Sequence, residues 1–270
     1  MEETPSKVEL AVQMTCQSCV DAVKSSLDGV QGIKSVSINL AQEQVIVEST
    51  LPTAEIQDLI EATGRRVVIK GQGTATTSHL GAAVVQLELP GPVMGVIRMV
   101  QATQDSCVID GTIDGLTPHG KHGLNIHEYG DLSQACNSCG DHYNPMSARH
   151  GGPLDAERHA GDLGNVTAEA NGRARFRIVD NRIKVWDVIG RSMVVHSRED
   201  DLGKGNMQTS AVDGNSGPGI ACGIIARASG LFENEKKICQ CDGVSLWNER
   251  DVPSAGPSRS QYAQPQQSQL

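Results

Sequence analysis

The apolar pattern of this chain changes near residue 73, and that change limits the folds available to it. Before this point, segments with the two-residue period of a strand alternate with segments that repeat every three to four residues, as helices do. After it, apolar segments of strand length are separated by glycine-rich turns, and helical periodicity is nearly absent. We therefore predict a mixed α+β unit followed by an all-β unit.

The first unit has the predicted order βαββαβ. Strands are expected over 7–14, 32–40, 43–49 and 65–70, and helices over 19–30 and 53–64. Thr53 is expected to cap the second helix. This order is typical of the ferredoxin-like fold, in which two helices cover one face of an antiparallel sheet. We assign residues 1–72 to this domain and the Gly- and Thr-rich residues 73–79 to a linker.

The second unit, residues 80–231, consists of strand-length segments. They lie at 81–90, 94–101, 107–116, 121–130, 172–180, 191–197 and 221–228. Such a series with tight glycine turns favours a β-sandwich or a Greek-key barrel. From about Phe232 the chain is rich in Pro, Ser and Gln, a composition that cannot bury a core. We expect residues 232–270 to form a flexible tail.

Charge and composition exclude several classes of function. The 270-residue chain has a formal net charge of −9, which argues against general binding to nucleic acid or anionic lipid. Its longest apolar runs are only strand-length, so no membrane span is expected, and its N-terminus lacks the features of a secretory signal. We therefore expect a cytoplasmic protein, in which cysteines serve metal binding or redox chemistry more often than permanent disulfides.

Cys16 and Cys19 fall between a predicted strand and a predicted helix. A helix N-terminus favours thiolate, and two thiolates form a soft site that selects Cu(I) over hard cations. Zinc would need further ligands, and residues 1–78 contain no other Cys and no His. The spacing alone leaves a disulfide or a redox centre open. The stretch MTCQSC resembles the loop of heavy-metal-associated copper-chaperone domains, which implies Cu(I) binding, with Met14 packed rather than a ligand.

Histidines are concentrated in the second unit. One glycine-rich loop holds His142, His150, His159 and Asp162, and three imidazoles with one carboxylate make a tetrahedral zinc set. Residues 80–227 resemble the Cu,Zn superoxide dismutase family in stretches such as GLNIHEYGD, RHGGP, ERHAGDLGN and VVHSREDDLGKG. This resemblance implies an eight-stranded Greek-key barrel. It also implies a Cys136–Cys222 disulfide, worth roughly 4 kcal/mol in the chain-entropy model.

The chain departs from that family at the copper site. The family holds copper with four histidines, and here Asn125 replaces one of them. The copper-site positions that remain are His127, His142 and His196. Gly219 stands where the family has an arginine that guides superoxide. We therefore expect little dismutase activity, whereas the zinc set is complete and Asp200 matches the carboxylate that supports a zinc ligand.

Cys239 and Cys241 form a CxC in the tail. On an extended segment both thiols face one side, close enough to share one Cu(I) or to form an exchangeable disulfide. Of the other cysteines, Cys107 is expected in the core, and Cys139 is either a passive loop thiol or a competitor for the disulfide.

The complete order of the chain, an MxCxxC domain, a dismutase-like domain and a CxC tail, resembles the family of copper chaperones for superoxide dismutase. The resemblance implies a metallochaperone rather than an enzyme. Such a protein delivers Cu(I) to Cu,Zn superoxide dismutase, promotes its intrasubunit disulfide and holds Zn(II) in its own barrel. Cys16 and Cys19 would acquire copper, and Cys239 and Cys241 would deliver it.

A partner surface also follows from the resemblance. Dismutases of this family are two-fold dimers, and the matching interface segments here are Asp187–Ser192 and Gly223–Ala228. The barrel can replace one subunit of such a dimer to give a heterodimer, or pair with a second copy as a homodimer. The rival functions are an active dismutase with a fused copper-binding domain and a copper store.

Overall fold

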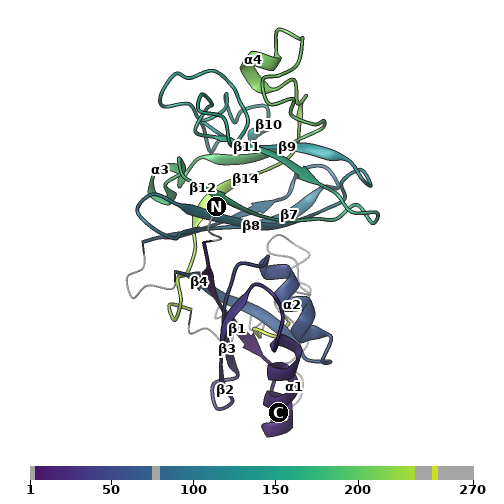
Figure 1. The fold of residues 1–270 in the computed structure, drawn as a ribbon. Helices are drawn as coiled ribbons and strands as arrows, with labels where there is room; N and C mark the ends of the chain where they lie inside the picture. The colour runs from purple at the N-terminus through teal and green to yellow at the C-terminus, as the bar shows by residue number, and fades with distance from the viewer. Residues whose placement is uncertain (1–3, 75–79, 235–244, 249–270) are drawn as a thin grey trace, which may run out of the picture.

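The computed structural model describes residues 4–74, 80–234 and 245–248. Figure 1 shows two units stacked along the long axis of the molecule, with the all-β unit above the smaller α+β unit. Within the described parts of the chain, no helix combines the length and the apolarity needed to cross a membrane.

The first unit is a four-stranded antiparallel sheet with two helices. Its strands are β1 (Ser6–Val12), β2 (Ile33–Asn39), β3 (Gln44–Ser49) and β4 (Val67–Gly73), hydrogen-bonded in the order β2-β3-β1-β4. Its helices are α1 (Gln17–Leu27) and α2 (Thr53–Glu61). Val23 and Leu27 of α1 and Ile56 and Ile60 of α2 are buried in a core shared with the apolar side chains of β1 and β3. The predicted ferredoxin-like order is confirmed.

The N-terminus of α2 differs from the prediction. Thr53 is the first helical residue, and Pro52 occupies the N-cap position with a φ of −55°, close to the angle that the proline ring imposes. The prediction that Thr53 caps the helix is therefore wrong. Its backbone N–H instead donates to Oδ2 of Asp110 in the second unit, at 2.8 Å. A carboxylate 57 residues away thus satisfies one of the free donors of this helix.

The second unit is a nearly closed antiparallel barrel. Its eight strands are β5 (Ala82–Leu87), β7 (Met94–Gln101), β8 (Cys107–Asp114), β9 (Lys121–His127), β11 (Asp162–Thr167), β12 (Ala174–Asp180), β13 (Ser192–His196) and β14 (Gly219–Arg227). They pair in the order β11-β9-β13-β14-β5-β7-β8-β12, and the end strands β11 and β12 contact each other. The predicted eight-stranded barrel is confirmed. Shorter elements are β6 (Leu89–Pro90), β10 (Ser133–Cys136), α3 (Val185–Val188) and α4 (Ser210–Asp213).

Strand β9 shows how the barrel positions the polar residues. Leu124 and Ile126 point into the apolar core, so the alternating Asn125 and His127 lie on the opposite face of the sheet. That face is buried as well, with Asn125 fully inaccessible, because the long loops between β9 and β11 and between β13 and β14 cover it. The barrel therefore has an apolar interior and a second, polar layer beneath its loops.

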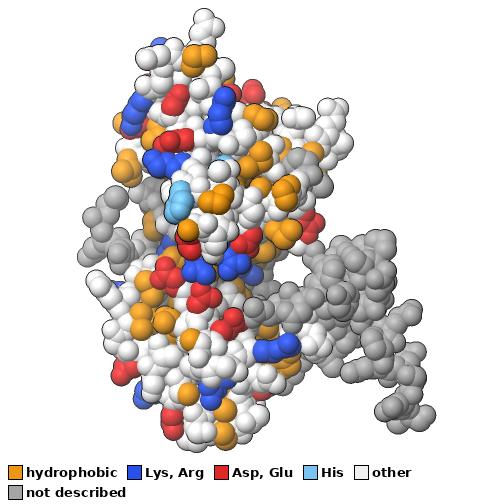
Figure 2. All heavy atoms as spheres, turned by 90° about the vertical axis from the view of Figure 1, so that its right-hand side faces the viewer, with side chains coloured by type: hydrophobic (Ala, Val, Ile, Leu, Met, Phe, Trp, Pro, Cys, Tyr) orange, Lys and Arg blue, Asp and Glu red, His pale blue; other side chains and the backbone are white. Residues whose placement is uncertain are grey.

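Charged side chains connect the two units. Arg177 of β12 donates to the backbone oxygens of Thr4 and Thr50 at 2.7 and 2.9 Å. Arg175 pairs with Asp58 of α2 at 2.8 Å. Figure 2 shows blue and red side chains gathered at the narrow waist between the units. The interface is thus largely polar, which is typical of domains that remain separable.

Candidate copper and zinc sites

Cys16 and Cys19 lie where β1 leads into α1. Cys16 is the N-cap residue, and the backbone N–H of Cys19, in the first turn, donates to its carbonyl at 3.0 Å. The two Sγ atoms are 3.6 Å apart, and the Cys16 side chain is exposed. Met14 is buried in the domain core, as expected for a residue that supports the loop. The arrangement offers two sulfur ligands at the surface of the protein.

The surroundings of Cys19 favour its thiolate. The backbone N–H of Thr15, followed by the Arg65 guanidinium and the Cys16 thiol, lowers the pKa of Cys19 to about 6. At neutral pH the side chain is therefore mostly the thiolate, which is the form that binds soft metals. Arg65 was not predicted to belong to this site, because it lies beyond α2 and no local pattern marks it.

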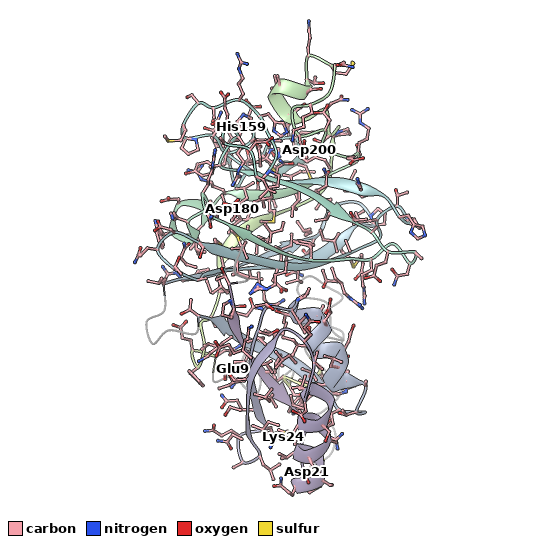
Figure 3. All side chains as sticks on the ribbon, viewed as in Figure 1. Glu9, Asp21, Lys24, His159, Asp180 and Asp200 are labelled. Carbon is pink, nitrogen blue, oxygen red and sulfur yellow. A yellow bond between two sulfur atoms is a disulfide. The ribbon has the colours of Figure 1, made fainter. Side chains whose placement is uncertain are left out.

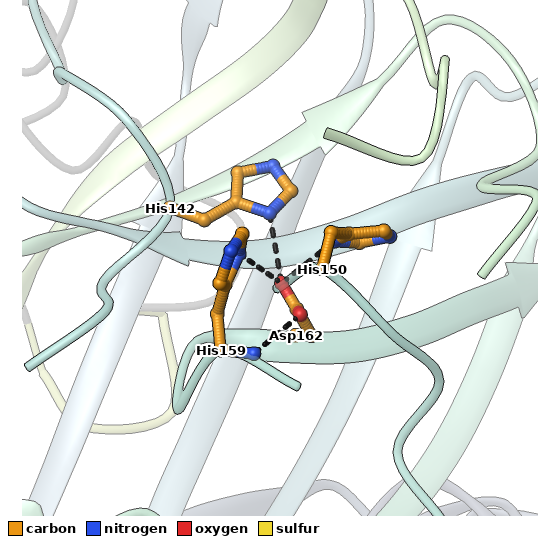
Figure 4. Close-up of side chains that lie close together, drawn as sticks. All are labelled: His142, His150, His159 and Asp162. Atoms are coloured by element: carbon orange, nitrogen blue, oxygen red, sulfur yellow. Dashed lines mark hydrogen bonds and ion pairs between the residues drawn. The ribbon is translucent and has the colours of Figure 1, made fainter. Parts of the chain in front are cut away.

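The four predicted zinc ligands meet beneath the loop before β11. Figure 4 shows the imidazoles of His142, His150 and His159 arranged around Asp162, with their Nδ1 atoms 2.8, 3.1 and 3.1 Å from its Oδ1. All four side chains are buried, and their ligand atoms lie within 4.8 Å of one another. Ligands of a tetrahedral zinc ion with bonds of 2.0–2.1 Å are about 3.3 Å apart. The set therefore fits Zn(II).

Hydrogen bonding alone does not satisfy this group. His142 Nε2 is buried without a hydrogen-bond partner among the described residues, and His150 Nδ1 is close to Asp162 Oδ1 but makes no hydrogen bond to it. Burial by itself disfavours the charged forms of both His150 and Asp162, since it lowers the pKa of the histidine and raises that of the carboxylate. Asp162 and Asp200 nevertheless raise the pKa of His150 to about 9, and the histidines hold the pKa of Asp162 far below its usual range. Asp200 Oδ1 lies 2.8 Å from His150 Nε2, so this carboxylate orients the ring, as predicted from its position.

His127, His142 and His196 form a second buried group. Nδ1 of His127 donates to Gly140 O and Nδ1 of His196 donates to Gly217 O, each at 2.8 Å. Burial, with neighbouring histidines, lowers the pKa of His127 to about 3 and that of His196 to about 4, so both rings are neutral at pH 7. Their Nε2 lone pairs then face each other across 3.2 Å. Two nitrogen lone pairs that point at the same space can bind a metal cation that prefers imidazole ligands.

Two residues distinguish this second group from a complete copper site. Asn125 pairs in register with Asp162, and neither polar atom of its side chain has a hydrogen-bond partner in the described part of the chain. At Gly219, an added Cβ would lie 2.7 Å from Cys136 Cβ and 2.8 Å from Val194 Cγ1. An arginine at position 219 would therefore require Cys136 and Val194 to shift.

The remaining cysteines lie in three places. Cys136 and Cys222 form a disulfide with a Cα–Cα distance of 5.7 Å. Cys139 is a buried thiol packed with them, and burial raises its pKa, which disfavours nucleophilic attack. Cys107 is buried in the barrel core, as expected. Cys239 and Cys241 lie outside the described residues.

The two candidate metal centres lie at opposite ends of the molecule. In Figure 3, His159 and Asp200 lie at the end of the barrel that faces away from the first domain. Asp21, two residues beyond Cys19, lies at the far end of the first domain. A metal ion held by Cys16 and Cys19 is therefore remote from the histidines of the same chain.

Apolar side chains are exposed around the predicted partner surface of the barrel. Tyr129 and Ile189 line a shallow hollow with Gly130 and Gly190, and Ile224 of β14 is exposed as well. Gly190 N–H donates to Ile225 O at 2.9 Å, which joins the two predicted interface segments. The hollow is also lined by the charged residues Glu128, Asp131, Asp187 and Arg191, so this surface combines apolar and charged groups, as protein-binding surfaces commonly do.

Known protein families match both units and the whole chain. Residues 9–77 match the heavy-metal-associated domain, and residues 93–225 match copper/zinc superoxide dismutase. The copper chaperone for superoxide dismutase of Homo sapiens is 57% identical to this chain over 96% of the chain and 94% of its own length. This chain belongs to the copper chaperones for superoxide dismutase. The resemblance inferred from the three motifs is thereby confirmed.

Two less similar relatives, a chaperone and a dismutase, show how much of the chain each kind of protein matches. The chloroplastic copper chaperone for superoxide dismutase of Oryza sativa subsp. japonica is 38% identical over 88% of this chain and 70% of its own length. Superoxide dismutase [Cu-Zn] A of Xenopus laevis is 47% identical over 53% of this chain and 95% of its own length. The dismutase therefore matches only about half of the chain, whereas the chaperone matches most of it.

Proposed function

We propose that this chain carries Cu(I) to Cu,Zn superoxide dismutase and promotes the intrasubunit disulfide of that enzyme. The observation that carries the proposal is the separation of the two metal-binding centres. Cys16 and Cys19 are accessible at one end of the molecule, and the histidines are buried at the other. Copper held by the cysteines is open to another molecule but not to the chain's own histidines. A two-sulfur site can release Cu(I) to an incoming third thiolate.

The tail cysteines complete the proposed transfer. Cys16 and Cys19 acquire copper, and Cys239 and Cys241 deliver it. The redox step follows copper release, when an oxidant such as O2 takes two electrons and two protons from the Cys239 and Cys241 thiols and leaves a disulfide. This disulfide exchanges with two thiols of the target, so the target gains the disulfide and the tail returns to two thiols.

Zinc is proposed as a resident structural ion. His142, His150, His159 and Asp162 are the proposed ligands, and the complete, buried ligand set supports this assignment. Bound Zn(II) would add folding free energy to the loop before β11. Asp200 holds the His150 ring in place. His127, His142 and His196 are retained positions of the family copper site.

The partner is proposed to bind the face of the barrel that the two predicted interface segments form. Segments Asp187–Ser192 and Gly223–Ala228 carry Ile189 and Ile224, whose exposure supports an interface with the target. A heterodimer with one dismutase subunit is the proposed working complex, and a homodimer through the same face is the alternative assembly. A two-fold interface of this kind accepts either partner.

Cellular location and domain limits are also proposed. We place the protein in the cytoplasm, in keeping with reactive thiols that need a reducing compartment. We assign the domains to residues 1–72 and 80–231, with a linker over 73–79 and a tail over 232–270. The start of β5 at Ala82 supports the second limit, whereas β4 extends one residue past the first, to Gly73.

The rival function is a catalytically active dismutase with a fused copper-binding domain. The match to the Xenopus laevis dismutase over 53% of the chain favours it. Asn125 and Gly219 oppose it, because the copper set has three histidines and position 219 carries no guiding arginine. The chaperone is therefore the better-supported function.

A mixing experiment tests the proposal. The Cu(I)-loaded chain is combined with zinc-bound, reduced, copper-free dismutase, and dismutase activity is followed. We expect activation by the natural chain and none by the Cys239→Ser/Cys241→Ser variant. Cys139→Ser, which removes a thiol outside both pairs, should activate normally. Unchanged activation by the tail variant would contradict the delivery role, and appreciable activity of the chain alone would favour the rival.

A further inference from the structure

After leaving the barrel, the chain crosses the first domain. Beyond the end of β14, the backbone N–H of Phe232 donates to Oε2 of Glu9 in β1 at 2.5 Å. Glu9 is buried, and its other oxygen contacts Lys70 at 3.4 Å. Gly71 of β4 allows close approach, because a Cβ there would overlap Gly230 O. This crossing fixes the chain on β1 and β4 just before the C-terminal segment.

A second contact follows further along the chain. Residues Ser245–Asn248 return to the first domain, where Arg66 Nη1 donates to Trp247 O at 3.0 Å and to Asn248 Oδ1 at 3.3 Å. Ser245, Leu246 and Trp247 are partly buried. In Figure 1 this short yellow segment lies beside the sheet of the first domain.

We propose that Ser245–Asn248 is a docking segment for the first domain, recognised by Arg66. Together with the Phe232–Glu9 contact, docking ties both ends of the CxC-bearing stretch to the domain that carries the CxxC pair. The docking stands on the contacts alone, and only the use of the tail cysteines rests on the proposed function.

The covalent chain limits how far the tail cysteines can lie from these contacts. Cys241 precedes Ser245 by four residues, so the two are separated by at most about 14 Å. Cys239 follows Asn234 by five residues and lies within about 18 Å of it. Arg65, next to the docking arginine, interacts with the Cys19 thiol. Adjacent residues thus contact the copper-acquiring pair and the docked segment.

Docking therefore has a consequence for transfer. A stretch held at both ends can reach fewer positions than one held at a single end, and both of these ends lie on the domain that carries Cys16 and Cys19, which favours exchange within one molecule. Release of Ser245–Asn248 leaves the stretch attached at one end only and extends its reach toward a partner. The segment acts as a positioning element for the tail.

Tryptophan fluorescence can test the docking without copper or dismutase. The chain has two tryptophans, so Trp186→Phe leaves Trp247 as the reporter in the full-length protein. Arg66→Ala is expected to lower the docked-to-undocked ratio about tenfold, because hydrogen bonds from a charged donor are lost. Trp247 emission should shift to longer wavelength, and acrylamide quenching should increase. Asn248→Ala should produce a smaller shift.

Lys34→Ala is the matched control, since it removes an exposed cation from β2 of the same domain. Unchanged emission in Arg66→Ala would overturn the docking, as would an equal shift in Lys34→Ala or fully exposed emission in the parent. Each of these results would leave the proposed function intact. A natural chain that docks but fails to activate dismutase would instead overturn the proposed function and leave the docking standing.

Discussion

Replacement of Asp110 by asparagine should make the chain more stable at neutral pH. Asp110 is buried at the domain interface, where it accepts the hydrogen bond from Thr53 N–H. Burial raises its pKa from 3.8 to about 6, although Thr53, Arg177 and Arg98 act in the opposite direction. An amide keeps the shape and an oxygen acceptor for Thr53 N–H but never ionises.

The size and the sign of the expected change in stability follow from the shift in the pKa of Asp110. The folded chain binds this proton more tightly than the unfolded chain, so the stabilising contribution is complete below about pH 4 and is lost as the pH rises through 6. A shift of about 2 pH units corresponds to about 3 kcal/mol. Asp110→Asn should therefore match the natural chain near pH 4 and exceed its free energy of unfolding by up to about 3 kcal/mol at pH 7.5.

Urea denaturation across this pH range measures the difference, and histidine titration common to both proteins cancels in it. A carbon-13 NMR titration of the Asp110 carboxyl should give a midpoint near 6. Asp28→Asn, at an exposed carboxylate after α1, controls for the loss of one charge. A less stable Asp110→Asn protein at pH 7.5, or a difference that does not grow with pH, would refute the reasoning.

Three further predictions concern the barrel. Asp200→Asn should weaken zinc binding by about 10- to 100-fold in competition with a chelator, because His150 loses the carboxylate that orients it; unchanged affinity would contradict this role. Cys222→Ser should lower the free energy of unfolding by about 4 kcal/mol in urea, and reduction of the natural chain should reproduce the loss. Arg177→Ala should loosen the domain interface and increase the radius of gyration in X-ray scattering, whereas an unchanged radius would show that its hydrogen bonds are dispensable.

Local patterns were sufficient to predict most of the fold. The alternation of apolar and polar residues in strands, and the helical spacing of apolar residues in helices, located every element of the first domain. These patterns are clear because each strand and helix buries one face against the same core. The strand pattern missed β11, because Asp162–Thr167 begins inside the glycine-rich loop and its first residues serve the metal site. The cluster proposed to bind zinc was visible in the sequence because its four residues lie close together along the chain.

Contacts between distant parts of the chain could not be predicted. The cap supplied by Asp110, the effect of Arg65 on Cys19 and the contact of Arg66 with Trp247 each depend on how separately folded segments meet. None of these leaves a periodic or compositional signal. Pro52 and Thr53 both suit the start of a helix, and nothing local in the sequence indicates that the Thr53 N–H meets a carboxylate of the other domain.

The crowding at Gly219 makes the two departures from the dismutase copper site unequal in cost. Asn125→His adds a ring in a strand that already holds His127. Gly219→Arg meets Cys136 and Val194 at its first side-chain atom, so these neighbours must shift before the guanidinium can be placed. Building dismutase chemistry into this barrel therefore requires repacking beside the disulfide as well as a fourth histidine.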